Sequence, residues 1–179
     1  MRMQVAYAIA GLMISSVAMA QAPAPAPVPV GAVAEVQRSY AGVKENILKS
    51  ADKMPAADYS YKPVADVRTY ARVVNHVTEA QLRSCGTVNG TPADKLAKVP
   101  AETADKAAIV AALKASFTEC DKAFASPVSG NLQDLFTLGQ GKRSRIGLLW
   151  GTVSHDNEQY ATLALYLRLK GIAPPSSEK

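Results

Sequence analysis

The chain has 179 residues, of which 48% are hydrophobic, and its 20 Lys and Arg against 15 Asp and Glu give a formal net charge of +5. This length suits one domain with a real hydrophobic core. Charges of both signs are scattered, and we interpret the one basic cluster, residues 142–145, as a solvated helix start. We expect no nucleic-acid partner, since that would require a basic face with interleaved aromatic residues.

The first 20 residues have the pattern of a secretory signal peptide. Arg2 precedes an apolar run from Val5 to Val17, and Ala18-Met19-Ala20 is a small-residue cleavage site. Because a membrane span needs roughly 20 apolar residues, an uncleaved anchor is the weaker interpretation. We therefore expect a periplasmic or secreted protein with no membrane span after cleavage.

Alternating Ala and Pro residues dominate residues 21–32. Such a segment favours the polyproline II conformation, and we interpret it as a stiff linker. Binding of this segment by a partner that recognises polyproline II is the alternative. One globular domain is then expected at residues 33–174, followed by a short tail at residues 175–179.

Four segments of the expected domain space their apolar residues as amphipathic helices do. They run from about Val33 to Pro55, Val67 to Cys85, Ala104 to Ala125, and Ser144 to Lys170. The segment at 126–141 reads as a loop, with a possible helical turn at 132–138, and no convincing strand is present. Because four such helices must bury their apolar stripes together, we predict an all-α fold, a four-helix bundle with a long connection between the second and third helices.

Cys85 and Cys120 are the only cysteines, and each falls on a predicted helix. An even count in an exported chain favours a disulfide, which would tie the second helix to the third. The chain-entropy model gives about 4 kcal/mol for closing a loop of this size. Two buried free thiols, or a thiol site with histidine, are the alternatives.

The chain also has only two histidines, His76 and His155. His155 and Gln159 lie about 40° apart on the fourth predicted helix, at the border of its apolar arc, and His76 borders the stripe of the second. Asp156 and Glu158 are expected to point away from this arc, toward solvent or ion pairs. Facing helices of a bundle can build a metal site from such side chains, although a lone interior histidine is more often a hydrogen-bonded core residue.

Several blocks of the sequence resemble the DinB-like family, a bundle family of metal-dependent proteins unrelated to the DNA polymerase of similar name. The similar blocks span essentially the whole expected domain: residues 51–55, 59–63, 67–70, 74–77, 141–145, 155–160 and 166–175. The resemblance implies a four-helix bundle that holds a divalent metal with three histidines, one from the second helix and two, spaced H-x-x-x-H, from the last. These positions correspond to His76, His155 and Gln159.

Gln159 departs from the family pattern. A glutamine carbonyl is a weaker ligand than imidazole for zinc, nickel or manganese, the metals we consider, and Glu79 is an alternative third ligand. The resemblance implies a metal-assisted enzyme. Some family members are thiol-dependent transferases, but thiol transfer suits an oxidising compartment poorly, so we expect hydrolysis of a small substrate instead. The alternative is a non-enzymatic periplasmic module with a degraded metal site, which binds a small molecule or an envelope protein.

Overall fold

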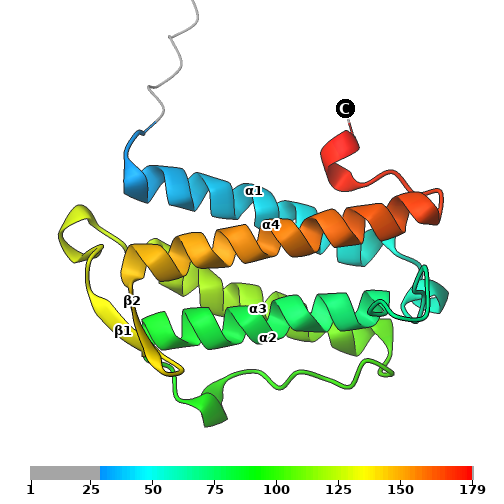
Figure 1. Ribbon diagram of the computed structural model, residues 1–179, viewed down its shortest axis with the longest axis horizontal. Helices are drawn as coiled ribbons and strands as arrows, with labels where there is room; N and C mark the ends of the chain where they lie inside the picture. Colours follow the sequence, from blue (N-terminus) through cyan, green and yellow to red (C-terminus); the bar gives the residue numbers. More distant parts are fainter. Residues whose placement is uncertain (1–28, 179) are drawn as a thin grey trace, which may run out of the picture.

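The computed structural model describes residues 29–178; the expected signal peptide, residues 1–20, and linker residues 21–28 lie outside this range. Four helices run along the length of the molecule: α1 (Ala32–Lys53), α2 (Tyr70–Asn89), α3 (Lys106–Ala125) and α4 (Arg145–Leu169) (Figure 1). The predicted all-α bundle is confirmed. Short 3-10 turns lie between and after them, at Ala56–Asp58, Ala93–Lys95, Ser129–Asn131 and Pro175–Ser177.

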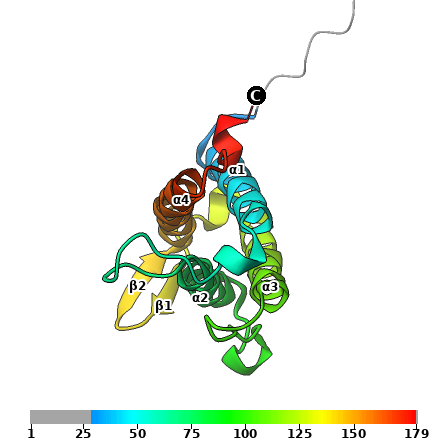
Figure 2. The same ribbon diagram turned by 90° about the vertical axis from the view of Figure 1, so that its right-hand side faces the viewer.

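The helices occupy the corners of the bundle in an order that differs from their order in the chain. Helices α1 and α2 lie at opposite corners, and each packs against both α3 and α4 (Figure 2). The α1–α2 connection at 54–69 and the α3–α4 connection at 126–144 each join diagonal helices, so they are long and cross the ends of the bundle. The α2–α3 connection at 90–105 is also long, as predicted. Within the described residues, no helix has the length and apolarity needed to cross a bilayer.

A small hairpin precedes α4, where the sequence predicted only a loop or a helical turn. Strands β1 (Leu135–Leu138) and β2 (Gly141–Ser144) pair antiparallel. The prediction of no strand was wrong because each strand has too few residues for its alternation to stand out. Phe136 and Leu138 are the two residues of β1 that pack against the core. Gly139 adopts the positive φ, +62°, that the turn between the strands requires.

Helix α2 begins three residues later and ends four residues later than its predicted bounds. Thr69 caps its start by accepting a hydrogen bond from the backbone N–H of Arg72. The predicted stop near Gly86 was wrong because this glycine serves packing: a Cβ there would lie 3.1 Å from methyl carbons of Leu96. The helix ends at Gly90, which adopts the left-handed conformation, φ +68°.

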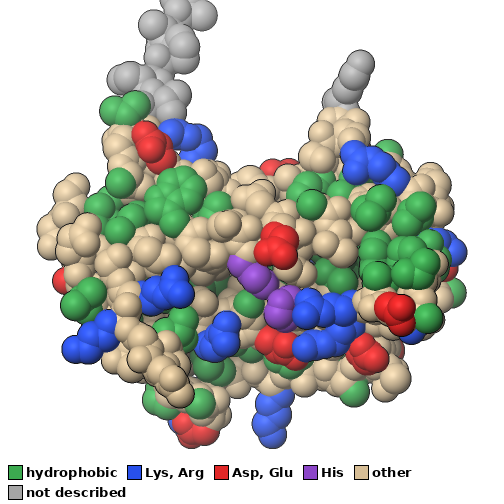
Figure 3. Space-filling view, in the orientation of Figure 1, with side chains coloured by type: hydrophobic (Ala, Val, Ile, Leu, Met, Phe, Trp, Pro, Cys, Tyr) green, Lys and Arg blue, Asp and Glu red, His purple; other side chains and the backbone are tan. Residues whose placement is uncertain are grey.

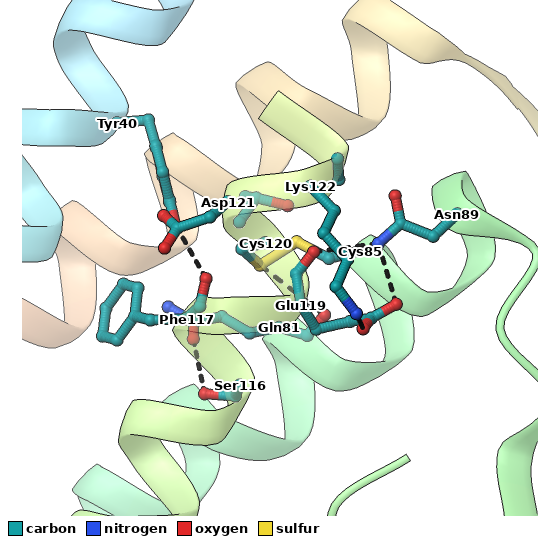
Figure 4. Close-up of a disulfide and its surroundings, with 12 residues drawn as sticks. Tyr40, Gln81, Cys85, Asn89, Ser116, Phe117, Glu119, Cys120, Asp121 and Lys122 are labelled. Atoms are coloured by element: carbon teal, nitrogen blue, oxygen red, sulfur yellow. Dashed lines mark hydrogen bonds and ion pairs between the residues drawn. A yellow bond between two sulfur atoms is a disulfide. The ribbon is translucent and has the colours of Figure 1, made fainter. Parts of the chain in front are cut away.

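A disulfide between Cys85 and Cys120 joins α2 to α3 (Figure 4). Their Cα atoms lie 4.9 Å apart, and both side chains belong to the buried core. On the other side of α3, Tyr40 of α1 donates a hydrogen bond of 2.8 Å to Asp121. Helices α2 and α3 are thus joined by a covalent bond, and α1 and α3 by a side-chain hydrogen bond.

Candidate metal centre

His76 of α2 and His155 of α4 come together on one face of the bundle. Their Nε2 atoms lie 3.2 Å apart, and their ring centroids are 4.9 Å apart in an edge-to-face arrangement. Both side chains remain partly exposed, 29% and 26%. Figure 3 shows the two rings in contact at the surface, with Lys and Arg side chains on both sides. Antiparallel packing of two sequence-distant helices therefore creates the predicted pair.

Each imidazole has a carboxylate on the side opposite the other ring. Nδ1 of His155 lies 3.4 Å from Oδ1 of Asp156, and Nδ1 of His76 lies 3.8 Å from Oε2 of Glu79. A carboxylate beside Nδ1 favours the tautomer that carries its proton there. In that tautomer both Nε2 atoms, 3.2 Å apart, carry a lone pair that is free to accept a proton or a metal ion.

Asp156 is the least expected member of the site. It was predicted to face solvent or form an ion pair at the surface, but its exposed fraction is 0%. Nε2 of Gln81 donates a 2.8 Å hydrogen bond to Oδ2 of Asp156, and the hydroxyl of Ser116 donates to the Gln81 carbonyl at 2.7 Å. A buried polar chain therefore runs from α3 through α2 to α4 and ends at the His155 ring.

Burial and these contacts shift the pKa values in opposite directions. Burial, reinforced by the charges of Arg68, His155 and Arg72, lowers the pKa of His76 below its usual value, despite the opposing effect of Glu79. His76 is therefore neutral at pH 7, the form that can ligate a metal. Burial raises the pKa of Asp156, against the opposing hydrogen bonds from His155 and Gln81.

Glu79 does not lie where the third ligand was considered. Its two oxygens accept hydrogen bonds from both terminal nitrogens of Arg72, at 2.8 and 3.0 Å, and this contact lowers the pKa of Glu79. Because Glu79 faces Nδ1 of His76, it lies behind the ring, on the side away from His155. Its geometry suits orientation of the imidazole and leaves the Nε2 side open.

Gln159 lies one helical turn after His155 and is 7% exposed. Within residues 29–178 the side-chain amide of Gln159 forms no hydrogen bond, so its carbonyl oxygen is free to accept one or to coordinate a metal ion. No group of three His, Cys, Asp or Glu side chains suited to a metal ion occurs in this described range. Any ligand set built from the two imidazoles therefore needs a neutral third ligand such as Gln159, or water.

Asp156 and Gln81 are the site residues that sequence reasoning missed, although the spacing carried a signal. Buried positions 149, 153, 156, 160, 163 and 167 of α4 alternate steps of four and three, as do 74, 78, 81, 85 and 88 of α2. Both polar residues therefore occupy core positions of their helices. A polar residue in such a stripe indicates a buried partner.

Comparison with known proteins agrees with this architecture. The sequence matches the family model of the DinB superfamily over residues 40–163, and a search of curated proteins found no match. The structure is similar to a DinB-like protein from Bacillus cereus, with 14% identity, a TM-score of 0.62, and coverage of 78% of this chain and 93% of that one.

Two further solved structures show the same fold. The DinB-like protein YjoA from Bacillus subtilis has 14% identity and a TM-score of 0.59, with coverage of 76% of this chain and 92% of that one. A conserved protein from Enterococcus faecalis has 13% identity and a TM-score of 0.62, with coverage of 79% and 98%. On the family match and this shared architecture, the chain belongs to the DinB superfamily.

Proposed function

We propose that this chain is an exported protein that binds a divalent cation between His76 and His155 and uses it to hydrolyse a small substrate. The observation that carries the proposal is the 3.2 Å approach of two Nε2 atoms whose rings are each backed by a carboxylate. Two neutral rings in the tautomer favoured by those carboxylates would repel each other unless a cation lies between their lone pairs. A proton or a metal ion meets that requirement.

The spacing of the two nitrogens fits shared coordination. Imidazole nitrogens lie about 2.0–2.1 Å from zinc, so two of them at a tetrahedral angle are roughly 3.3 Å apart. The observed separation of 3.2 Å is close to that value. Histidine ligands commonly donate their other N–H to a carboxylate, which is the role that the positions of Asp156 and Glu79 support.

In this proposal, His76 and His155 supply two ligands and the carbonyl of Gln159 the third. A divalent ion held by these residues would supply Lewis-acid chemistry for hydrolysis. Asp156 and Glu79 hold the rings in orientation, while Arg72 keeps Glu79 behind His76. The neutral state of His76 at pH 7 avoids competition between a proton and the cation.

Export is supported by the signal-like first 20 residues and by the Cys85–Cys120 disulfide, since disulfides persist in oxidising compartments. Expression of the full chain in a bacterial host with two membranes tests it. Periplasmic protein whose mass corresponds to a start at Gln21 is the expected product. Full-length protein confined to the cytoplasm would contradict export.

Metal content tests the site directly. Protein purified without a tag should contain about one equivalent of zinc, nickel or manganese by elemental analysis, and His76→Ala or His155→Ala should lose it. Glu158→Gln, a change at an exposed position on the same helix, is the matched control and should retain the metal. Metal-free wild-type protein that also fails to bind added ions would disprove the proposed site.

Activity is then measured with chromogenic esters, amides and phosphate monoesters, with and without the metal. Turnover that requires the metal and disappears in His155→Ala supports hydrolysis. The second candidate is a binding module without catalysis, favoured by the lack of a third charged or imidazole ligand within the described residues. Stoichiometric metal without turnover of any of these substrates would favour that alternative.

A further inference from the structure

A small cavity adjoins the histidine pair on the side opposite Gln159 along α4. Its volume is about 130 Å³, and it is lined by Ala80, Arg83 and Ser84 of α2 and by Gly151, Thr152 and His155 of α4. A cavity of this size has room for several waters or one small charged group. The larger cavity between α1 and the start of α3, about 620 Å³, contains no histidine.

Small residues create this space between the two helices. A Cβ placed on Gly151 would meet no heavy atom within 4 Å, so its lack of a side chain leaves the cavity open. Ala80 contributes only a methyl group from the facing helix. A larger side chain at position 151 would project into unoccupied volume without displacing the core, which provides a means of blocking the cavity.

The polar groups of the cavity are suited to an anion. Within residues 29–178 no carboxylate lies within ion-pair distance of Arg83, and Ser84 offers a hydroxyl beside it. Thr152 already donates its hydroxyl proton to the carbonyl of Leu148 at 2.9 Å. Arg83 and Ser84 are therefore the donors available to a ligand.

The cavity lining contains the charge of Arg83 and no carboxylate, whereas Glu79 and Asp156 lie behind the two histidine rings. Arg72 is neutralised by Glu79, whereas Arg83 keeps its charge unpaired within the described range. An anion entering the cavity would meet the Arg83 guanidinium and, with the proposed metal bound, a cation at the histidine pair.

We propose that the cavity is the recognition site for the anionic group of the substrate, a carboxylate or phosphate that is held by the Arg83 guanidinium and the Ser84 hydroxyl beside the metal. This inference rests on the proposed metal function and adds the class of substrate to it. Arginine binds both oxyanions through charge-assisted hydrogen bonds, and the cavity volume limits the group to a few heavy atoms.

Cobalt-loaded protein tests the proposal, because the visible spectrum of Co²⁺ reports its surroundings. Acetate and inorganic phosphate are titrated separately at constant ionic strength, and a saturable spectral change is expected. Loss of a charge-assisted contact costs about 1.5–3 kcal/mol, so Arg83→Gln should raise the apparent Kd about 10- to 100-fold. The anion with the lower Kd distinguishes a carboxylate from a phosphate group.

Two further variants separate the cavity from general effects of charge and folding. Gly151→Leu should block binding while helical content and cobalt affinity stay unchanged. Arg38→Gln removes an exposed charge from α1, the helix diagonal to α2, and should titrate as the wild type. Equal Kd values for wild type and Arg83→Gln, or equal losses in Arg83→Gln and Arg38→Gln, would overturn the anion site.

The outcomes also distinguish failure of the anion site from failure of the metal site. Normal cobalt binding with no spectral response to either anion overturns the anion site and leaves the proposed metal site standing. Absence of cobalt binding in the wild type overturns the metal site itself, and with it an anion group held beside the metal. Normal cobalt binding by Arg83→Gln with a weakened anion response supports both.

Discussion

Gln81 of α2 donates a 2.8 Å hydrogen bond to Asp156 of α4, and both side chains have no exposed surface. This bond joins the same two helices that carry His76 and His155. A buried carboxylate without a partner would be costly, so the rotation of α4 that satisfies Asp156 is strongly favoured. That rotation also places the adjacent residue, His155, at the edge of the α2–α4 interface, facing His76.

Removal of the Asp156 charge should weaken the proposed metal site. Asp156→Asn keeps the shape of the side chain, but it can present its N–H group to His155 and disturb the tautomer. We expect zinc affinity to fall about 10- to 100-fold, as for other partners of ligand histidines. Competition with a chromophoric chelator measures the affinity, and Glu158→Gln is the control. Wild-type zinc affinity in a folded Asp156→Asn protein would contradict the orienting role.

A third imidazole should strengthen metal binding at the proposed site. Gln159 lies one turn after His155 and is 7% exposed, so Gln159→His places a stronger ligand at the position that corresponds to the family pattern. We expect zinc affinity to increase at least about tenfold, since imidazole nitrogen is a better ligand than an amide oxygen. Gln159→Leu serves as the comparison and should lower the affinity. If the histidine variant binds zinc no better than the leucine variant, residue 159 does not face the proposed metal position.

Reduction of the Cys85–Cys120 disulfide should destabilise the bundle. The bond closes a loop between residues separated by 35 positions, and the chain-entropy model assigns about 4 kcal/mol to such a closure. Urea unfolding with and without a reductant measures the difference in unfolding free energy, and Cys85→Ala/Cys120→Ala should reproduce it. Identical urea midpoints under both conditions would show that the bond contributes little to stability.

Glu119 should give the unfolding free energy a defined pH dependence. Burial raises the pKa of its carboxyl, but hydrogen bonds from Thr91, Asn89 and Lys122 outweigh this effect and lower it. As the pH falls, the Glu119 carboxylate is therefore protonated earlier in the unfolded chain than in the folded chain. The stabilisation that ionised Glu119 gives the folded state is complete above pH 4.5 and is lost as the pH falls below that value.

Urea unfolding of wild type and Glu119→Gln from pH 3 to pH 7 tests this expectation. At pH 7 the variant should be less stable by about 1.5–3 kcal/mol, the usual value of hydrogen bonds to a charged group. The difference should shrink as the pH is lowered. A difference that stays constant over the whole range would indicate that the Glu119 charge is not involved.

The local sequence accounts for the helices and part of the site. Apolar spacing predicted four helices because each must bury a stripe, and caps such as Thr69 and Ser144 fix where two of them begin. The family resemblance indicated His76, His155 and Gln159. The hairpin at 135–144 was missed because four-residue strands carry too few alternating positions to outweigh a loop pattern.

The sequence alone determined that the chain has helices with apolar stripes, two cysteines able to pair, and histidines at the edges of two stripes, because these properties depend on spacing along one helix. Only the tertiary structure decided that Asp156 is buried, that Glu79 lies behind His76, and that Arg83 borders a cavity beside His155. These relationships depend on how α2 and α4 are rotated against each other. Such a rotation is set by packing of the whole core, and no single segment specifies it.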